Sequence, residues 1–267
     1  MPLLVGTSGW QYRDWRDAFY PPGRPAARWL EYYASRFCTV ENNGTFYRLA
    51  GPDTFRQWQE RTPPGFVMAV KASRYLTHVR RLREPAEPVQ RLLAAAAGLG
   101  PALGPVLLQL PPTFRADPGA LAACLDEFVR PRAELSAPVR VCVEFRHDSW
   151  LTATVRSILA SHDAALCWSD RRGRPLGPLW QTASWGYLRW HEGAAADWPR
   201  YGRQALRTWM NRIGEAFAPD RDVYAYFNND QHAAAPADAA ALASVAARAG
   251  WQVPSPADEA GNAPRGR

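Results

Sequence analysis

The chain has 267 residues, 47% of them hydrophobic and 12 of them tryptophan, enough for one α/β barrel or two small domains with an aromatic-rich core. Its formal net charge of +7 permits contact with anions, but the arginines are dispersed along the chain, so nucleic-acid binding has little support. No apolar stretch approaches the roughly 20 residues of a membrane span, and no charged N-terminal segment leads into an apolar one, so we expect a cytoplasmic protein without membrane contact.

Eight short apolar runs recur along the chain, and helical patterns separate most of them. The runs are rich in Val, Leu, Phe, Tyr and Cys, which is typical of buried parallel strands. In chain order, the expected strands are residues 3–7, 37–43, 66–71, 106–110, 139–146, 165–170, 186–191 and 222–228.

The intervals carry helix signals. Residues 25–36 have apolar side chains at helical spacing, and residues 52–61 open with Pro and Asp, a helix-start signature. The other expected helices are residues 89–98, 117–129, 151–161, 201–217 and 237–249. Residues 173–184 are rich in Pro and Gly, so the sixth helix should be short or degenerate. Residues 254–267 hold mainly Pro, Ala, Gly and charge, and we expect one domain over residues 1–251 with a disordered tail over 252–267.

The alternation of strands and helices indicates a parallel sheet. Eight units in about 250 residues match a TIM-type (β/α)₈ barrel. A doubly wound open sheet is the alternative, but it would require a glycine-rich phosphate turn after the first strand. The sequence there, Gly6-Thr7-Ser8-Gly9-Trp10, lacks the GxGxxG spacing. We therefore predict an α/β fold of the TIM type with parallel strands and a degenerate sixth helix.

Polar residues gather at the ends of these strands, where a barrel holds its catalytic groups. They are Ser8, Glu41, Asn43, Lys71, Gln109, Glu144, Arg146, Asp170, Arg189, His191, Asn228, Asn229 and Asp230. Glu144 shares a strand face with Arg146, and Arg189 shares one with His191. Charges cannot lie unpaired against an apolar core. They form either a structural ion-pair network or a polar barrel mouth, and we favour the mouth.

Lys71 is the only lysine among the 32 lysine and arginine residues, and it closes an expected strand. In a chain this rich in Ala, Pro and Gly, a surface lysine drifts easily to arginine, so a retained lysine indicates a task that arginine cannot perform. Lysine is a compact charge whose pKa moves on burial, whereas arginine stays protonated and planar. Chance survival at a strand end is the alternative.

Seven short motifs occur in a specific order. They are Gly6-Thr7-Ser8-Gly9-Trp10, Thr45-Phe46-Tyr47, Thr77-His78, Val143-Glu144-Phe145-Arg146-His147, Ser149-Trp150, Arg189-Trp190-His191 and Tyr226-Phe227-Asn228-Asn229-Asp230. Over residues 3–249 the chain resembles the YecE-like family, domain of unknown function seventy-two. The resemblance implies a TIM-barrel-type fold and no established reaction. The chain departs from the family at Asn42, where an aliphatic residue is usual, and we expect Asn42 to face the helical layer.

The leading hypothesis is an enzyme that acts by acid/base chemistry on a small anionic or polyol substrate, such as a sugar phosphate. Glu144, His191 and Lys71 are the expected catalytic residues. The expected substrate-binding residues are Trp10, Glu41, Asn43, His78, Arg146, Arg189, Asn228, Asn229 and Asp230. A Schiff base on Lys71 would require a lowered pKa, which neighbouring arginines favour and Glu144 opposes.

Two other functions compete with this one. A metal-dependent hydrolase or nuclease would draw on a ligand pool of Glu41, Glu144, Asp170, His191 and Asp230. Lys71 and Arg189 would repel the cation, and no HxH or HExxH motif is present, so we predict no cofactor and keep a divalent metal as the alternative. The four cysteines lack CxxC spacing, so we expect neither disulfide nor zinc. A non-enzymatic nucleic-acid or ligand-binding protein would lose affinity steeply as salt rises.

Overall fold

Ten strands carry the fold of the residues that the computed structural model describes, namely 2–135, 137–217 and 220–256. They are β1 (Leu3–Thr7), β2 (Thr39–Asn42), β3 (Val67–Lys71), β4 (Leu103–Gln109), β5 (Val141–Glu144), β6 (Ala165–Leu166), β7 (Trp168–Arg171), β8 (Arg174–Pro175), β9 (Gly186–Trp190) and β10 (Val223–Phe227). Every expected apolar run contains a strand. The prediction of an α/β fold with parallel strands is therefore confirmed.

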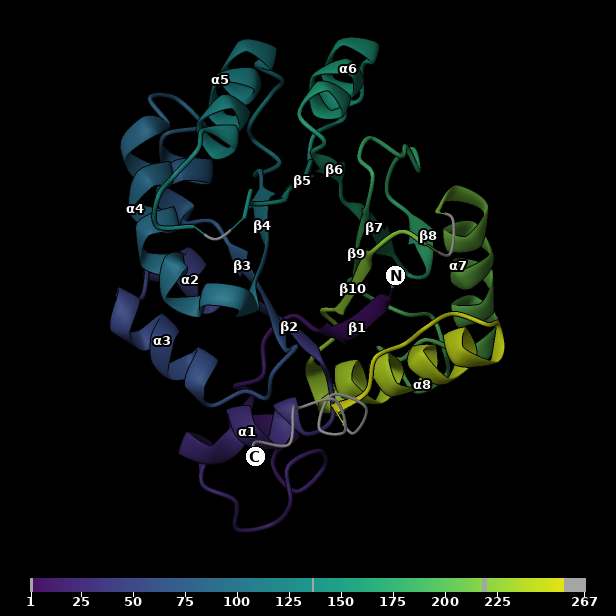
Figure 1. The fold of residues 1–267 in the computed structure, drawn as a ribbon. Helices are drawn as coiled ribbons and strands as arrows, with labels where there is room; N and C mark the ends of the chain where they lie inside the picture. Colours follow the sequence, from purple (N-terminus) through teal and green to yellow (C-terminus); the bar gives the residue numbers. More distant parts are fainter. Residues whose placement is uncertain (1, 136, 218–219, 257–267) are drawn as a thin grey trace.

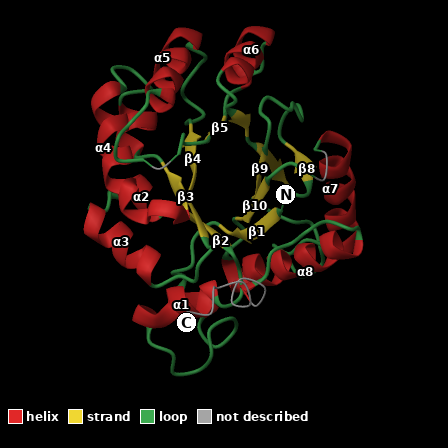
Figure 2. Cartoon of the chain, viewed as in Figure 1, coloured by secondary structure: helices red, strands yellow, loops and turns green. Residues whose placement is uncertain are grey.

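Within these residues the strands form two five-stranded sheets, ordered β1-β10-β9-β7-β8 and β2-β3-β4-β5-β6. All pairings are parallel except that of β7 with β8. The sheets adjoin at two places: a parallel bridge links Ser8 to Glu41, and one residue separates β6 from β7. Figure 2 shows the strands around a common centre with the helices outside. The hydrogen-bonded ladders thus differ from the single closed ring expected.

Eight α-helices surround the strands in the described part of the chain (Figure 1). They are α1 (Trp29–Ala34), α2 (Gly44–Tyr47), α3 (Pro52–Glu60), α4 (Ala86–Ala96), α5 (Pro118–Val129), α6 (Ala153–Ser161), α7 (Arg203–Ala216) and α8 (Ala234–Arg248). Side-chain caps define two starts: Asp117 accepts from the Ala120 amide, and Thr152 accepts from the Val155 amide. Residues 173–184 contain no helix, only β8. None of the helices in the described ranges is long and apolar enough to span a membrane.

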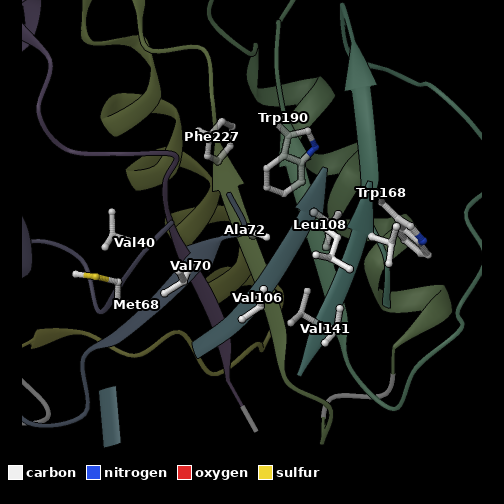
Figure 3. Packing of buried hydrophobic residues seen from close by; sticks show 14 of the residues in the cluster. Val40, Met68, Val70, Ala72, Val106, Leu108, Val141, Trp168, Trp190 and Phe227 are labelled. Atoms are coloured by element: carbon white, nitrogen blue, oxygen red, sulfur yellow. The ribbon is translucent and has the colours of Figure 1, made fainter. Parts of the chain in front are cut away.

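The strands have two different apolar faces. Alternate residues such as Val40, Val70, Val106 and Leu108 pack outward in the large cluster beneath the helices (Figure 3). The intervening residues, including Ala69, Leu107, Cys142 and Tyr187, form a smaller inner cluster. Because side chains alternate along a strand, the inner face continues two residues further to Lys71, Gln109, Glu144 and Arg189. The strands therefore direct a set of polar side chains inward at their carboxyl ends.

The chain stays attached to the domain beyond α8. The amide of Leu3 donates to the carbonyl of Gln252 at 2.9 Å, and Val253 packs against the large cluster. Residues 252 and 253, which were assigned to the expected tail, thus contribute to the domain. Residues 257–267 of that tail lie outside the described residues.

Candidate functional site

Arg189 lies at the centre of the polar cluster. Only 2% of its surface is exposed, and it lies between two fully buried carboxylates. Its Nη1 donates to Glu144 at 2.6 Å, and its Nη2 and Nε donate to Glu41 at 3.0 and 3.2 Å. Charge-assisted bonds in this forked geometry are strong and directional. Arg189 therefore fixes the two carboxylates relative to each other.

Glu41 is also bonded to groups on its other sides. Ser8 Oγ donates to Glu41 Oε1 at 2.5 Å, and Tyr187 donates to Oε2 at 2.6 Å. These bonds join β2 of one sheet to β1 and β9 of the other. Glu41 thus lies where the two sheets meet, and Arg189, Ser8 and Tyr187 already use both of its oxygens.

Glu144 pairs with Arg146 and His191 as well as with Arg189. Its Oε1 lies 2.7 Å from Arg146 Nη2 and 2.9 Å from His191 Nε2. Burial would raise the pKa of Glu144, but Arg189, His191 and Arg146 together hold it well below its usual range. Glu144 is therefore a carboxylate at neutral pH.

Both ring nitrogens of His191 have polar partners. Its Nε2 lies 2.9 Å from Glu144 Oε1 and its Nδ1 lies 3.0 Å from the Asn228 Nδ2. Nε2 also lies 2.9 Å from Arg146 Nη2, which only donates, so Nε2 faces both an acceptor, Glu144, and a donor, Arg146, and the contacts fit either tautomer. Burial lowers the pKa of His191, with help from Arg189 and Arg146 and against the effect of Glu144. His191 is neutral at pH 7.

Lys71 differs from the other charged residues of the cluster in its surroundings, since no polar group in the described part of the chain bonds its amine. Its side chain is nearly buried, at 9% exposure, and Nζ lies 4.4 Å from the centre of the Phe46 ring. Among the described residues, Nζ has no hydrogen bond and no ion pair. Burial and the nearby Arg189 lower the pKa of Lys71 to about 8, while Glu41 and Glu144 act in the opposite direction. A cation–π contact replaces little of the solvation that an ammonium loses.

His78 packs against the ring of Phe46, which Lys71 also contacts. The two rings are 5.0 Å apart with an edge-to-face geometry, and Thr77 Oγ1 lies 2.9 Å from His78 Nδ1. Partial burial and the charge of Lys71 lower the pKa of His78. His78 therefore lies close enough to Lys71 for the lysine charge to act on it.

The structure brings most of the predicted site residues together but not all. Trp10 is 4% exposed and packs edge-on against Trp58 in the outer cluster, so its ring is not available in the mouth. Asn229 is buried and donates to Pro199 and Asp238, so it acts as a structural residue there. The cluster thus excludes two residues that were expected to bind substrate.

The remaining predicted residues lie at the margin of the cluster. Asp230 is half-buried and lies near Tyr12. Burial raises the pKa of Tyr12, and the charges of Asp230 and Glu41 raise it further. Asn43 has a buried Oδ1 with no partner in the described part of the chain. Asn42 faces the outer cluster, where its amide contacts Met68, as its departure from the family pattern predicted.

Asp170 and Tyr201 orient His191, and only the first of them was considered from the sequence. Asp170 accepts from the backbone amide of His191 at 2.9 Å and from Tyr201 at 2.7 Å. Phe46 is the other residue whose role was missed. Tyr201 precedes α7 and Phe46 lies in the short α2, and neither position carries a periodic signal. Only the motif Thr45-Phe46-Tyr47 singled out Phe46 beforehand.

A cavity of about 590 Å³ opens beside the cluster, between the ends of β5, β7 and β9. Arg146 and His191 line it, together with Gln109 and apolar residues that include Trp168 and Leu176. Lys71, Glu144 and Arg189 do not line it, although we expected all their tips to share one pocket with His191. Glu144 and Arg189 are closed off because they pair with each other.

The carboxylates are poorly arranged for a metal ion. In the described ranges, no three His, Cys, Asp or Glu residues are grouped so that they could hold one. Arg189 occupies the space between Glu41 and Glu144 where a shared cation would have to lie. The ligand pool proposed from the sequence is therefore not assembled.

Comparison with known proteins supports the family resemblance. Residues 4–262 match the family described as protein of unknown function DUF72. The chain is 24% identical to UPF0759 protein YunF of Bacillus subtilis (strain 168) over 258 residues, covering 85% of this chain and 89% of YunF. It is 31% identical to UPF0759 protein YecE of Escherichia coli (strain K12) over 112 residues, covering 42% of this chain and 39% of YecE.

Solved structures give the same result for the fold. A DUF72 family protein from Thermotoga maritima MSB8 superposes with a TM-score of 0.73 at 25% identity, over 90% of this chain and 96% of that one. A DUF72 family protein from Enterococcus faecalis V583 superposes with a TM-score of 0.72 at 17% identity, over 91% and 94% of the two chains.

Proposed function

The chain belongs to the DUF72 family of proteins of unknown function, and we propose that it is an enzyme that acts on a small organic anion or polyol. The chemistry is acid/base chemistry at the carboxyl ends of the strands. Lys71 and His191 exchange protons with the substrate, and Arg146 binds its negative charge.

The partnerless ammonium of Lys71 is the observation that carries this proposal. A buried charge without a hydrogen-bonded counter-ion destabilises the folded state. Natural sequences retain such groups where function requires them, and shifted pKa values gather at functional sites. With a pKa of about 8, Lys71 takes up and releases a proton close to neutral pH.

His191 supplies the second proton-transfer group. It is neutral, and the Glu144 carboxylate behind it stabilises the imidazolium form. In the imidazolium form both ring nitrogens donate, so the Asn228 amide then presents its oxygen to Nδ1. Asp170 is a positioning residue, because its carboxylate accepts from the backbone amide of His191 and from Tyr201.

The fold gives this site a familiar setting. We propose that the two sheets are halves of a TIM-type (β/α)₈ barrel, because they adjoin at the Ser8–Glu41 bridge and between β6 and β7. In such barrels catalytic groups come from the carboxyl ends of several strands. The cluster draws on β2, β3, β5 and β9, which supports this assignment.

A metal-dependent hydrolase is less well supported, since Arg189 lies between both carboxylates and pairs with each of them. We propose that no metal or other cofactor is needed. Addition of EDTA tests this directly: activity lost on chelation and restored by a divalent ion would favour the alternative.

The experiment is a thermal-shift and turnover screen of the wild-type protein against sugar phosphates, hydroxycarboxylates and polyols. Ligands that raise the melting temperature are then tested on Lys71→Arg, Lys71→Met and His191→Gln, with Arg207→Met on the exposed face of α7 as the control for loss of a positive charge. We expect the three site variants to lose turnover and the control to keep it. Wild-type turnover in both Lys71 variants would refute the proposal, and binding that weakens steeply with salt and extends to nucleic acid would favour a non-enzymatic binding protein.

A further inference from the structure

We propose that the cavity beside His191 receives the apolar body of the substrate, so that the substrate is an organic anion carrying an aromatic or branched aliphatic group. This inference rests on the proposed function and narrows its substrate class. A simple sugar phosphate would fill only the polar end of the site.

One wall of the cavity is apolar. Leu151, Leu166, Trp168 and Leu179 line it, and Leu176 lies at its rim with 45% of its surface exposed. Trp168 is fixed in place, because its Nε1 donates to the carbonyl of Trp180 at 3.0 Å. The apolar surface of Leu176 would be removed from water by the apolar body of a ligand in the cavity, which favours binding.

The segment that follows β8 closes this wall. Leu176, Pro178 and Leu179 line the cavity, and Gly177 approaches the base of α6: a Cβ at Gly177 would lie 3.6 Å from Leu151 Cδ1. In place of the barrel helix that would follow the sixth strand, residues 173–184 thus form a loop whose apolar residues line the cavity. This loop supplies a binding surface that a regular barrel helix would not provide.

The opposite end of the cavity is suited to an anion. Arg146 directs Nη2 to Glu144, but its Nε is buried and has no hydrogen-bond partner in the described part of the chain. A buried donor without an acceptor is costly, and an oxygen of a bound carboxylate or phosphate would satisfy it. The ligand's charged group would then lie next to His191.

Acidic residues also line the cavity, but two of them are already occupied. Asp170 accepts from Tyr201 and from the His191 amide. Glu192 accepts from Trp198 at 2.9 Å and lies 3.9 Å from Arg171. Asp148 is exposed. We therefore place the ligand's negative charge at Arg146, whose Nε donor has no partner in the described part of the chain.

The volume agrees with a ligand of this kind. Binding sites of about 300–1,000 Å³ bury most of a drug-sized molecule, and the cavity measures about 590 Å³. A two-ring aromatic carboxylate fits that range, with its rings against Leu151, Leu176 and Leu179 and its carboxylate at Arg146.

Isothermal titration with 2-naphthoate tests the inference. Inorganic phosphate provides the charge without the apolar body, and 2-naphthalenemethanol provides the body without the charge. Leu176→Asp places a carboxylate on the apolar rim, and Val129→Asp on α5 is its matched control, since Val129 is 52% exposed and does not line the cavity. Arg146→Gln removes the proposed anion donor.

We expect the wild type and Val129→Asp to bind 2-naphthoate equally, and Leu176→Asp and Arg146→Gln each to bind it about 10-fold more weakly. Both partial probes should bind at least about 10-fold more weakly than 2-naphthoate. No binding by the wild type, equal binding by Leu176→Asp, or equal affinity for inorganic phosphate would overturn the inference. Lys71→Met separates the two proposals, because Lys71 does not line the cavity. This variant should still bind 2-naphthoate, which tests the cavity, whereas its loss of turnover tests the proposed function.

Discussion

The amine of Lys71 should titrate with a midpoint near pH 8 in the folded protein. Burial and the charge of Arg189 lower its pKa from 10.5 to about 8. At pH 7.5 about a quarter of the molecules would then carry the neutral amine, against about 0.1% for an unperturbed lysine, a difference of roughly 200-fold. Since lysine occurs only once in the chain, any side-chain amine chemistry reports on this residue alone.

The assay measures, as a function of pH, the rate at which a small amine-reactive reagent labels Lys71. Cleavage after Arg61 and Arg74 releases Lys71 in the single peptide 62–74, and mass spectrometry separates it from the N-terminal amine. Restricted access slows labelling at every pH but leaves the midpoint unchanged. Arg146→Gln should raise the midpoint, because Arg146 lowers the pKa of Lys71. A wild-type midpoint near 10.5, equal to that in denaturant, would refute the reasoning.

Three further outcomes follow from the same contacts. Lys71→Met should stabilise the protein at pH 7 by about 3 kcal/mol, because the folded pKa lies below the unfolded one. That gain should be complete below pH 8 and fade as the pH approaches 10.5; urea unfolding at pH 7 and pH 10 that shows no such difference would contradict it. Glu144→Gln should lower stability by about 3–5 kcal/mol, since it leaves Arg189 undercompensated, and an unchanged melting temperature would count against the buried pair. Asn228→Asp should raise the pKa of His191, because a carboxylate beside Nδ1 stabilises the imidazolium; an NMR titration measures this, and no shift would mean that the Nδ1 contact is absent.

The elements of the fold were largely predictable, because burial on both faces leaves a clear mark on a strand. Runs such as residues 66–71 consist almost wholly of apolar residues, and each of the eight runs contains at least one strand. The hairpin of β7 with β8 was missed, since Arg174 and Pro175 have no apolar alternation. The four-residue α2 was also missed, because a single turn is too short to show a helical period.

The site was predictable where it depended on strand alternation. Glu144 and Arg189 each lie two residues after an inward-facing residue, Cys142 or Tyr187. Because side chains alternate along a strand, both point to the centre as well. Trp10 was misassigned because it lies beyond a turn: Gly9 has φ of +94°, a conformation that favours glycine, and the chain that follows packs Trp10 in the outer cluster. No pattern in the sequence reveals the direction of the chain after such a residue.

Charge balance explains why arginine would not replace Lys71. Two carboxylates, Glu41 and Glu144, face two guanidinium groups, Arg189 and Arg146, so the buried cluster is neutral without the lysine. Lys71 can join it as a neutral amine, whereas an arginine at this position would stay charged and add an uncompensated positive charge. Lys71→Arg should therefore be less stable than Lys71→Met at pH 7 and should also fail in turnover. Denaturant unfolding of the two variants measures the difference, and equal stability would show that the mouth has room and solvent for a wide cation, which would return the survival of this lysine to chance.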